Sequence, residues 1–244
     1  MKAIVTKIVL GTATLYGSAQ AVGNIADTPA RPDAHRLQIG QFIYRDSGHG
    51  KILGTSRIII QKDVRTGNFN FSDESKGYFD QQWETVASPQ FSPISAKLNY
   101  GPLSNSVPYF DLAYASGKVR GLRCRTRTDC NPMTPVEGSI SEDTVDQRID
   151  WATVIASELQ PGRRFHFSVY DPSIGTSPVT AEVAPAGQIQ VPAGSFKAFR
   201  ITYRVEKATG AEQYIVFASE RMPRILIRED FPDGTTSELL RATK

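Results

Sequence analysis

The stretch that decides the fold is Val191–Val205, VPAGSFKAFRITYRV. A proline, an alanine and a glycine stand directly before a run in which apolar residues fall on every second position. This alternation is typical of a strand with one buried face, whereas a phosphate-binding glycine loop must open a helix. We therefore expect a corner that starts a central strand. Its core-facing side chains are predicted to be Phe199, Ile201, Tyr203 and Val205.

Alternation of the same kind continues on both sides of this strand. HRLQIGQFIYR and ILGTSRIIIQK flank the Gly-rich turn Asp46–Lys51, and two such runs across a turn predict a β-hairpin. Further strands are expected in NFNFS, YFDQQWETV, FSPISAKLNY, YFDLAYASGKVRGLRC, RRFHFSVYD, PVTAEVAPAGQIQ, EQYIVFAS, RILIREDF and SELLRA.

One segment has a helical period instead. The run DTVDQRIDWATVIASELQPG carries acids in its first turn and ends at Pro161-Gly162, both of which are helix-boundary signals. Its apolar stripe is expected to consist of Val145, Ile149, Ala152, Ile155 and Leu159. Because this stripe must be buried and the rest of the chain is strand, we predict a mainly β fold: a curled antiparallel sheet, or incomplete β-barrel, packed around one amphipathic helix.

The first residues predict export. Met1–Ala21 has lysines at its start, a short apolar stretch and small residues ending in an A-x-A pattern, as in a cleavable secretory signal peptide. A membrane anchor is the alternative, but the apolar stretch is about half of the roughly 20 residues that a spanning helix needs. Residues 22–34 contain proline and lack a pattern, which predicts a flexible leader, and residues 35–244 form a single domain.

These boundaries predict a soluble, periplasmic or secreted mature protein with no transmembrane segment, cut after Ala21. Loss of Lys2 and Lys7 with the signal peptide brings the formal charge of +3 close to neutrality, so basicity gives no argument for a nucleic-acid partner.

The two cysteines, Cys124 and Cys130, are expected to form a disulfide that closes a short polar loop, because exported chains meet an oxidising compartment. A redox-active pair would favour Cys-x-x-Cys at a helix start. A metal site would need two further ligands, and no histidine lies nearby. We therefore predict no metal.

Catalytic patterns are also missing. Ser195 opens a strand rather than a strand-to-helix elbow. His166 lies between two phenylalanines, so it is expected at the rim or in solvent if they face the core. Glu229 and Asp230 are adjacent on a strand, so their side chains point to opposite faces and cannot flank one glycosidic bond. We predict no catalytic residue and no cofactor.

Arginine is the polar residue that repeats usefully. Arg200 and Arg204 lie opposite the core-facing residues of their strand, and Arg224 and Arg228 share one parity later in the chain. Neighbouring strands would place them in a basic stripe for an anionic headgroup or acidic partner. Alternatively they pair with Glu206, Glu212, Glu220 and Glu229 on a solvated face. The candidate binding residues are Arg200, Arg204, Arg224, Arg228, Tyr203 and Trp151.

The order of helix, LQPGRRFHFSVYD, VPAGSFKAFRITYRV, EQYIVFASERMPRILIRED, PDG turn and SELL resembles a bacterial secreted family of unknown function, over roughly Asp143–Leu240. That family is similar in architecture to lipoprotein-carrier proteins, whose incomplete β-barrel holds apolar ligands against internal helices. The resemblance implies a fold and carries little function.

Three functions are consistent with these observations. The favoured hypothesis is a non-catalytic exported carrier that binds an apolar or lipid-like small molecule in its half-barrel within the cell envelope. The second is an envelope assembly factor that binds another protein through strand edges or the arginine stripe. The third is an enzyme with an unconventional half-barrel pocket.

Overall fold

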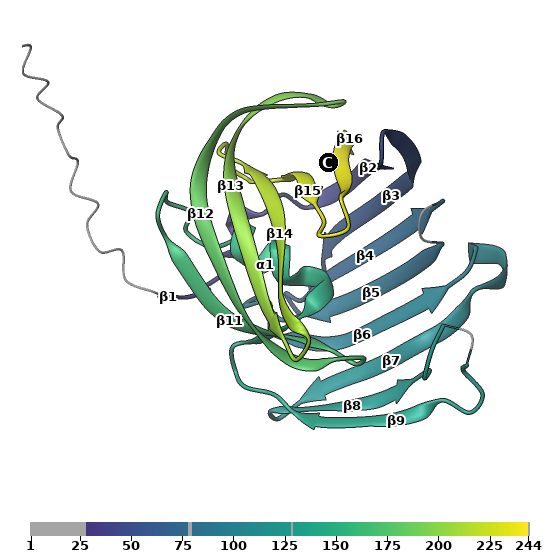
Figure 1. The fold of residues 1–244 in the computed structure, drawn as a ribbon. Helices are drawn as coiled ribbons and strands as arrows, with labels where there is room; N and C mark the ends of the chain where they lie inside the picture. The colour runs from purple at the N-terminus through teal and green to yellow at the C-terminus, as the bar shows by residue number, and fades with distance from the viewer. Residues whose placement is uncertain (1–27, 78–79, 128, 244) are drawn as a thin grey trace, which may run out of the picture.

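The computed structural model describes residues 28–77, 80–127 and 129–243, so the expected signal peptide and residues 22–27 lie outside the described residues. These residues form one 16-stranded sheet that curls on itself, and Figure 1 shows its two halves facing each other with the helix α1 (Asp150–Ile155) between them. The expected curled sheet, mainly β with a single short α-helix among the described residues, is confirmed.

The first half is an antiparallel meander in which each strand pairs with the next. It contains β2 (Gly40–Gly48), β3 (Lys51–Lys62), β4 (Phe69–Lys76), β5 (Gln81–Ala87), β6 (Pro93–Tyr100), β7 (Val107–Ala115), β8 (Lys118–Arg123) and β9 (Thr134–Ser139).

The second half repeats this antiparallel arrangement. It contains β11 (Arg164–Asp171), β12 (Gly175–Val191), β13 (Gly194–Lys207), β14 (Gly210–Ser219), β15 (Leu226–Asp230) and β16 (Thr235–Thr243). Two short strands pair with β11 in parallel: β1 (Thr28–Pro29) and β10 (Thr144–Asp146). The end of the expected leader is therefore part of the sheet.

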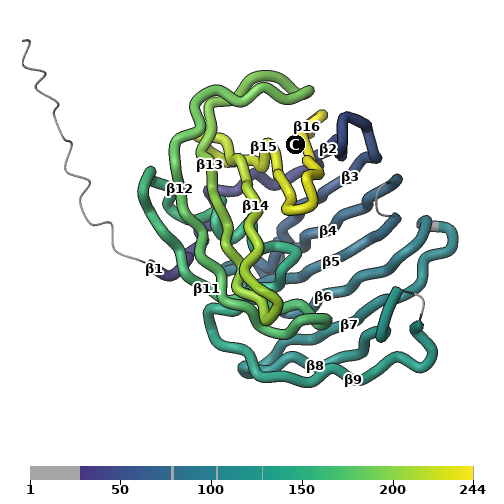
Figure 2. The backbone as a smooth tube through the Cα atoms, viewed as in Figure 1, coloured from purple at the N-terminus to yellow at the C-terminus, as the bar shows by residue number. Residues whose placement is uncertain are grey.

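The two meanders join where the last strand, β16, pairs with β2, the first strand of the other meander. Figure 2 shows the C-terminus beside β2, far along the sheet from β9. The sheet has two ends, β1 and β9, and is not closed.

The stretch Val191–Val205 forms the corner expected of it. Val191 pairs with Gly194 across a two-residue turn, and Gly194 has a φ of 128°, which a residue with a side chain rarely adopts. The amide of Ala193 in this turn donates to Leu239 O of β16 at 2.9 Å. This bond ties the tip of the longest hairpin to a strand three places away and so helps to curl the sheet.

The helix is shorter than predicted. Thr144–Asp146 pair with β11 instead of opening a helix, and the Asp146 side chain accepts from Arg148 N at 3.0 Å to start the 3-10 turn Gln147–Ile149. Six of the described residues are α-helical, those of α1. The expected stripe is buried, but so are Trp151 and Val154 on other faces, so α1 is a core helix and not an amphipathic one.

The polar loop between β8 and β9 is closed by the predicted disulfide, Cys124–Cys130. Cys124 is buried, and its amide donates to Tyr109 O of β7 at 2.7 Å. The disulfide therefore fixes the loop to the end of the sheet.

Candidate functional site

Two hollows open between the described residues. The larger, about 1000 Å³, lies where the end of β3 and the start of β4 meet the chain before β2. The smaller, about 660 Å³, lies between the two meanders beside α1. We call the smaller one the cleft. Buried acidic side chains line only the cleft among the described residues of both hollows, so it is the better candidate for specific chemistry.

A row of polar side chains crosses neighbouring strands on the wall of the cleft. Asp46 of β2 accepts hydrogen bonds from Ser56 Oγ of β3 and Ser237 Oγ of β16, both at 2.7 Å. Ser237 lies opposite Glu229 of β15 in the strand register. The row therefore runs without interruption from β15 through β16 and β2 to β3.

The row continues onto β4. Asp73 is 6% exposed, and its Oδ2 accepts from Ser75 Oγ at 2.5 Å, while Oδ1 is buried with no hydrogen-bond partner. We call the acids Asp46, Asp73 and Glu229 the carboxyl row. All three line the cleft.

Removal from water raises the pKa of two acids in the row. Burial, opposed by the Ser75 hydrogen bond and assisted by the negative charges of Asp46 and Glu74, raises the pKa of Asp73 to about 7. Burial, with the nearby acids Asp150, Asp230 and Asp46, raises the pKa of Glu229 to about 8.

A fourth acid enters the cleft from α1. Asp150 is 4% exposed; its Oδ1 accepts from Trp151 N at 2.5 Å, and its Oδ2 accepts from the hydroxyl of Tyr214 on β14. Burial raises the pKa of Asp150 to about 7, against the effect of these two donors. The cleft thus has acids on both walls.

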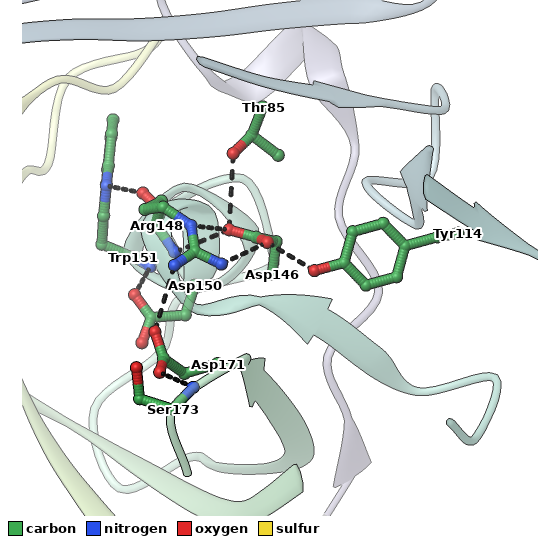
Figure 3. Close-up of polar contacts among 8 residues, drawn as sticks. All are labelled: Thr85, Tyr114, Asp146, Arg148, Asp150, Trp151, Asp171 and Ser173. Atoms are coloured by element: carbon green, nitrogen blue, oxygen red, sulfur yellow. Dashed lines mark hydrogen bonds and ion pairs between the residues drawn. The ribbon is translucent and has the colours of Figure 1, made fainter. Parts of the chain in front are cut away.

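An ion network fixes the segment that carries Asp150 (Figure 3). Asp146, with no exposed surface, accepts from Arg148 Nε and Nη2 at 2.5 Å each and from Tyr114 Oη of β7 at 2.7 Å. Arg148 Nη1 also donates to Asp171 of β11 at 3.2 Å. Burial alone would lower the pKa of Arg148, but Asp146 raises it above its ordinary value. Each charged side chain of this network has a partner within it, and the network anchors α1 to both meanders.

The four candidate arginines do not share one surface, because Arg224 is buried while the other three lie on the outer face. Arg204 pairs with Glu206 and Arg228 with Asp230 on the outer face, while Arg200 donates to Thr202 Oγ1 at 2.9 Å. Arg224 is 5% exposed. Its Nη1 donates to the carbonyls at the end of α1, those of Ile155 at 3.0 Å and Ser157 at 2.8 Å. Arg224 therefore stabilises the end of α1 and is not available to bind a ligand.

The two aromatic candidates lie in the interior. Tyr203 is fully buried, stacks on Tyr214 with ring centroids 4.6 Å apart, and has an unpartnered hydroxyl. Trp151 lines the cleft, and its Nε1 donates to Arg148 O at 3.1 Å.

The acids of the carboxyl row were not selected from the sequence, although a signal was present. Each follows two apolar residues of the same parity: Asp46 follows Phe42 and Tyr44, Asp73 follows Phe69 and Phe71, and Glu229 follows Ile225 and Ile227. An acid that follows two buried apolar residues of the same parity is such a signal, because burial of an unpaired charge is costly.

Two kinds of feature, a membrane-spanning helix and a metal-binding cluster, are absent from the described residues. None of their helices is long and apolar enough to span a membrane. None of their histidine, cysteine, aspartate and glutamate side chains are grouped in threes or more in a way that could hold a metal ion.

The fold and the cleft define a β-barrel-like protein with an acidic, partly hollow interior. The chain belongs to DUF3108, a family of proteins of unknown function, whose model matches residues 45–240. The expected membership of a family of unknown function is confirmed, and the match begins well before Asp143.

Similar solved structures are distant in sequence. A β-barrel-like protein of the DUF1849 family of unknown function from Brucella abortus shares 14% identity, covers 85% of this chain and 100% of its own, and has a TM-score of 0.50. This likeness supports the barrel-like fold alone.

Two further structures match more weakly. A protein assigned as exported, with a YmcC-like fold, from Bacteroides fragilis shares 11% identity over 89% of this chain and 99% of its own, with a TM-score of 0.34. A protein assigned as a lipoprotein from Parabacteroides distasonis shares 10% identity over 89% of this chain and 100% of its own, with a TM-score of 0.32. No functionally curated protein matches the chain.

Proposed function

We propose that this protein is a non-catalytic binding protein of the cell envelope, which holds a lipid-like small molecule in the cleft. The observation that carries the proposal is the cleft itself, since about 660 Å³ lies within the range of small-molecule sites. The signal-peptide pattern of Met1–Ala21 supports export.

The wall of the cleft suits a ligand with an apolar body. Apolar side chains from both meanders and from α1 contribute to it: Ile58, Trp83, Trp151, Val205, Leu226 and Phe231. Burial of hydrocarbon against such a wall contributes about 25 cal/mol for each Å² removed from water.

The same wall disfavours a pure hydrocarbon. A ligand without polar groups would remove the carboxyl row from any remaining water and give it no hydrogen bond, which costs free energy. The ligand class that fits is therefore amphiphilic, with an apolar chain and a polar end group.

The matched variants Ile58→Trp and Ile59→Trp test this proposal. Ile58 is 9% exposed and lines the cleft, whereas Ile59 is on the opposite face of β3. Nile red, a neutral apolar dye, should bind the native protein with a rise in fluorescence. Because the larger ring occupies the cleft, Ile58→Trp should weaken binding about tenfold, a loss of 1.4 kcal/mol. Ile59→Trp should bind the dye as the native protein does.

Circular dichroism shows whether both variants are folded. Equal dye binding by the two folded variants, or no binding by the native protein, would contradict a ligand site in the cleft.

A further inference from the structure

We propose that the carboxyl row selects the end group of the ligand: a cationic nitrogen group with N–H donors, such as an ammonium, on an apolar chain. This inference rests on the proposed binding function and adds the charge of the ligand.

Two acids of the carboxyl row have oxygen atoms to which no protein group donates a hydrogen bond. Asp73 Oδ1 is buried and has no partner, and no hydrogen bond or ion pair of the described residues reaches the Glu229 carboxyl. Buried polar groups in folded proteins are nearly always hydrogen-bonded, so the buried Asp73 Oδ1 asks for an explanation. Asp46 differs, since two serines already donate to it.

The charge of the cleft also favours a cationic end group. Its described lining contains two cationic side chains, Arg148 and Lys207, and both are engaged: Arg148 with Asp146 and Asp171, and Lys207 with Glu212. No protein cation is therefore left for Asp73 or Glu229. An anionic end group would meet repulsion here, whereas a cation would supply the missing counter-charge.

The arrangement of the acids favours an organic cation over a metal ion. A metal needs several oxygen or nitrogen ligands around one point, and the acids of the described residues are not grouped in that way. Glu229 and Ser237 lie opposite each other, and Asp73 is on β4, beyond β2 and β3, so the acceptors form a line. An ammonium donates to the acceptor beside it, a carboxylate farther along the line acts on its charge through space, and its chain can extend along the apolar wall.

The position of Glu229 makes it the first carboxyl group of the row that a ligand contacts. It is partly exposed and lines the cleft, so a ligand reaches it directly, while Asp73 adds a second negative charge farther along the row. An ammonium beside a carboxylate favours its ionised form, so binding near neutral pH should release protons.

Several charged and titratable groups lie near these two acids and affect the size of that release. Asp46 of β2 faces both; Glu74 of β4 lies near Asp73; Asp150 of α1 and Asp230 of β15 lie near Glu229, as do the hydroxyls of Tyr44, Tyr203 and Tyr214.

Isothermal titration calorimetry with octylamine, octanol and octanoate tests the inference, because these probes share a chain and differ in charge. At about pH 7, octylamine is protonated, as a lysine side chain is, and the raised pKa values of Asp73 and Glu229 leave protons to be released. It should bind at least about tenfold more tightly than the other two probes. Titrations in buffers of different ionisation enthalpy should show proton release with octylamine alone.

Variants identify the acids. Glu229→Gln and Asp73→Asn should each weaken octylamine binding about tenfold and leave octanol binding unchanged. The matched controls are the neighbours Asp230→Asn and Glu74→Gln, whose side chains lie on the outer face with Arg228 and Arg57. Both should bind octylamine within about twofold of the native protein.

The outcomes separate the two proposals. Equal affinity for all three probes, or full octylamine binding by the double variant Asp73→Asn/Glu229→Gln, would overturn the inference and leave a cleft that binds apolar chains. Failure of all three probes and of Nile red would overturn the binding function as well. A variant that removes a buried carboxylate is not expected to unfold, so lost octylamine binding with retained octanol binding is not explained by misfolding.

Discussion

Glu229 illustrates how one residue sets the character of the interior. It follows Ile225 and Ile227 on the inner face of its strand, where an apolar side chain would complete the core. Its neighbour Asp230 points outward and pairs with Arg228 at 2.5 Å. The expectation that these two acids face opposite ways is therefore confirmed, and the difference in their surroundings follows from it.

This position predicts how stability depends on pH. The pKa of Glu229 is raised to about 8 in the folded protein, so between its ordinary value and about 8 the folded state holds a proton that the unfolded state has lost. Stability therefore falls as pH rises through this window. Glu229→Gln removes this loss, and it should be more stable than the native protein at about pH 9 by on the order of 3 kcal/mol, with a much smaller difference at about pH 5.

Urea unfolding of both proteins at these two pH values measures the difference. Asp230→Asn serves as the control, because its carboxylate is paired and should give no such gain at high pH. If the native protein gained stability relative to Glu229→Gln between about pH 5 and 9, the raised pKa of Glu229 would be contradicted.

The segment from β10 to α1 shows how an element is held by side chains of its neighbours. Its sequence has the apolar period of a long helix, and the period correctly marks which side chains are buried. The length is wrong because Thr144–Asp146 obtain their backbone partners from β11, and Asp146 then starts the turn with its side chain. Sequence periodicity reports burial, but it does not report which strand is available for pairing.

The anchor predicts a large effect at Arg148. Arg148→Met leaves Asp146 buried with no counter-charge, and this should cost about 3–5 kcal/mol of unfolding free energy. Arg164→Met is the matched control, because Arg164 and Glu182 form an exposed pair, which contributes at most about 1 kcal/mol. Urea denaturation measures both.

The double variant Asp146→Asn/Arg148→Met refines this test. Removal of both charges should recover part of the loss, because the cost lies in the unpaired buried carboxylate. Equal stability of Arg148→Met and Arg164→Met would contradict the anchor.

At the scale of the whole molecule, the sheet has an order that local patterns could not supply. The hairpins, the corner at Gly194 and the curled β class follow from alternation and turn residues, which act between neighbours in sequence. The pairing of β16 with β2 joins residues about as far apart as the described chain allows. The carboxyl row exists only because of this pairing, since it places Ser237 beside Asp46. The alternation of the sequence therefore indicates that these acids point inward, but it does not indicate that they lie in one row.

This pairing predicts that the two meanders unfold together. Tyr44 of β2 donates to Leu226 O of β15 at 3.0 Å in the core, and the Ala193 amide donates to Leu239 O of β16. Neither meander can therefore lose its packing without exposing the other.

The chain has two tryptophans, Trp83 in β5 and Trp151 in α1. Trp83→Phe therefore leaves fluorescence that reports on α1, and Trp151→Phe leaves fluorescence that reports on β5. Within each variant, urea transitions followed by fluorescence and by far-ultraviolet circular dichroism should share one midpoint, as two-state unfolding requires. Separate midpoints for β5 fluorescence and total strand content would mean that the first meander folds alone, and that the contact between β16 and β2 is a docking surface within the chain and not a continuous sheet.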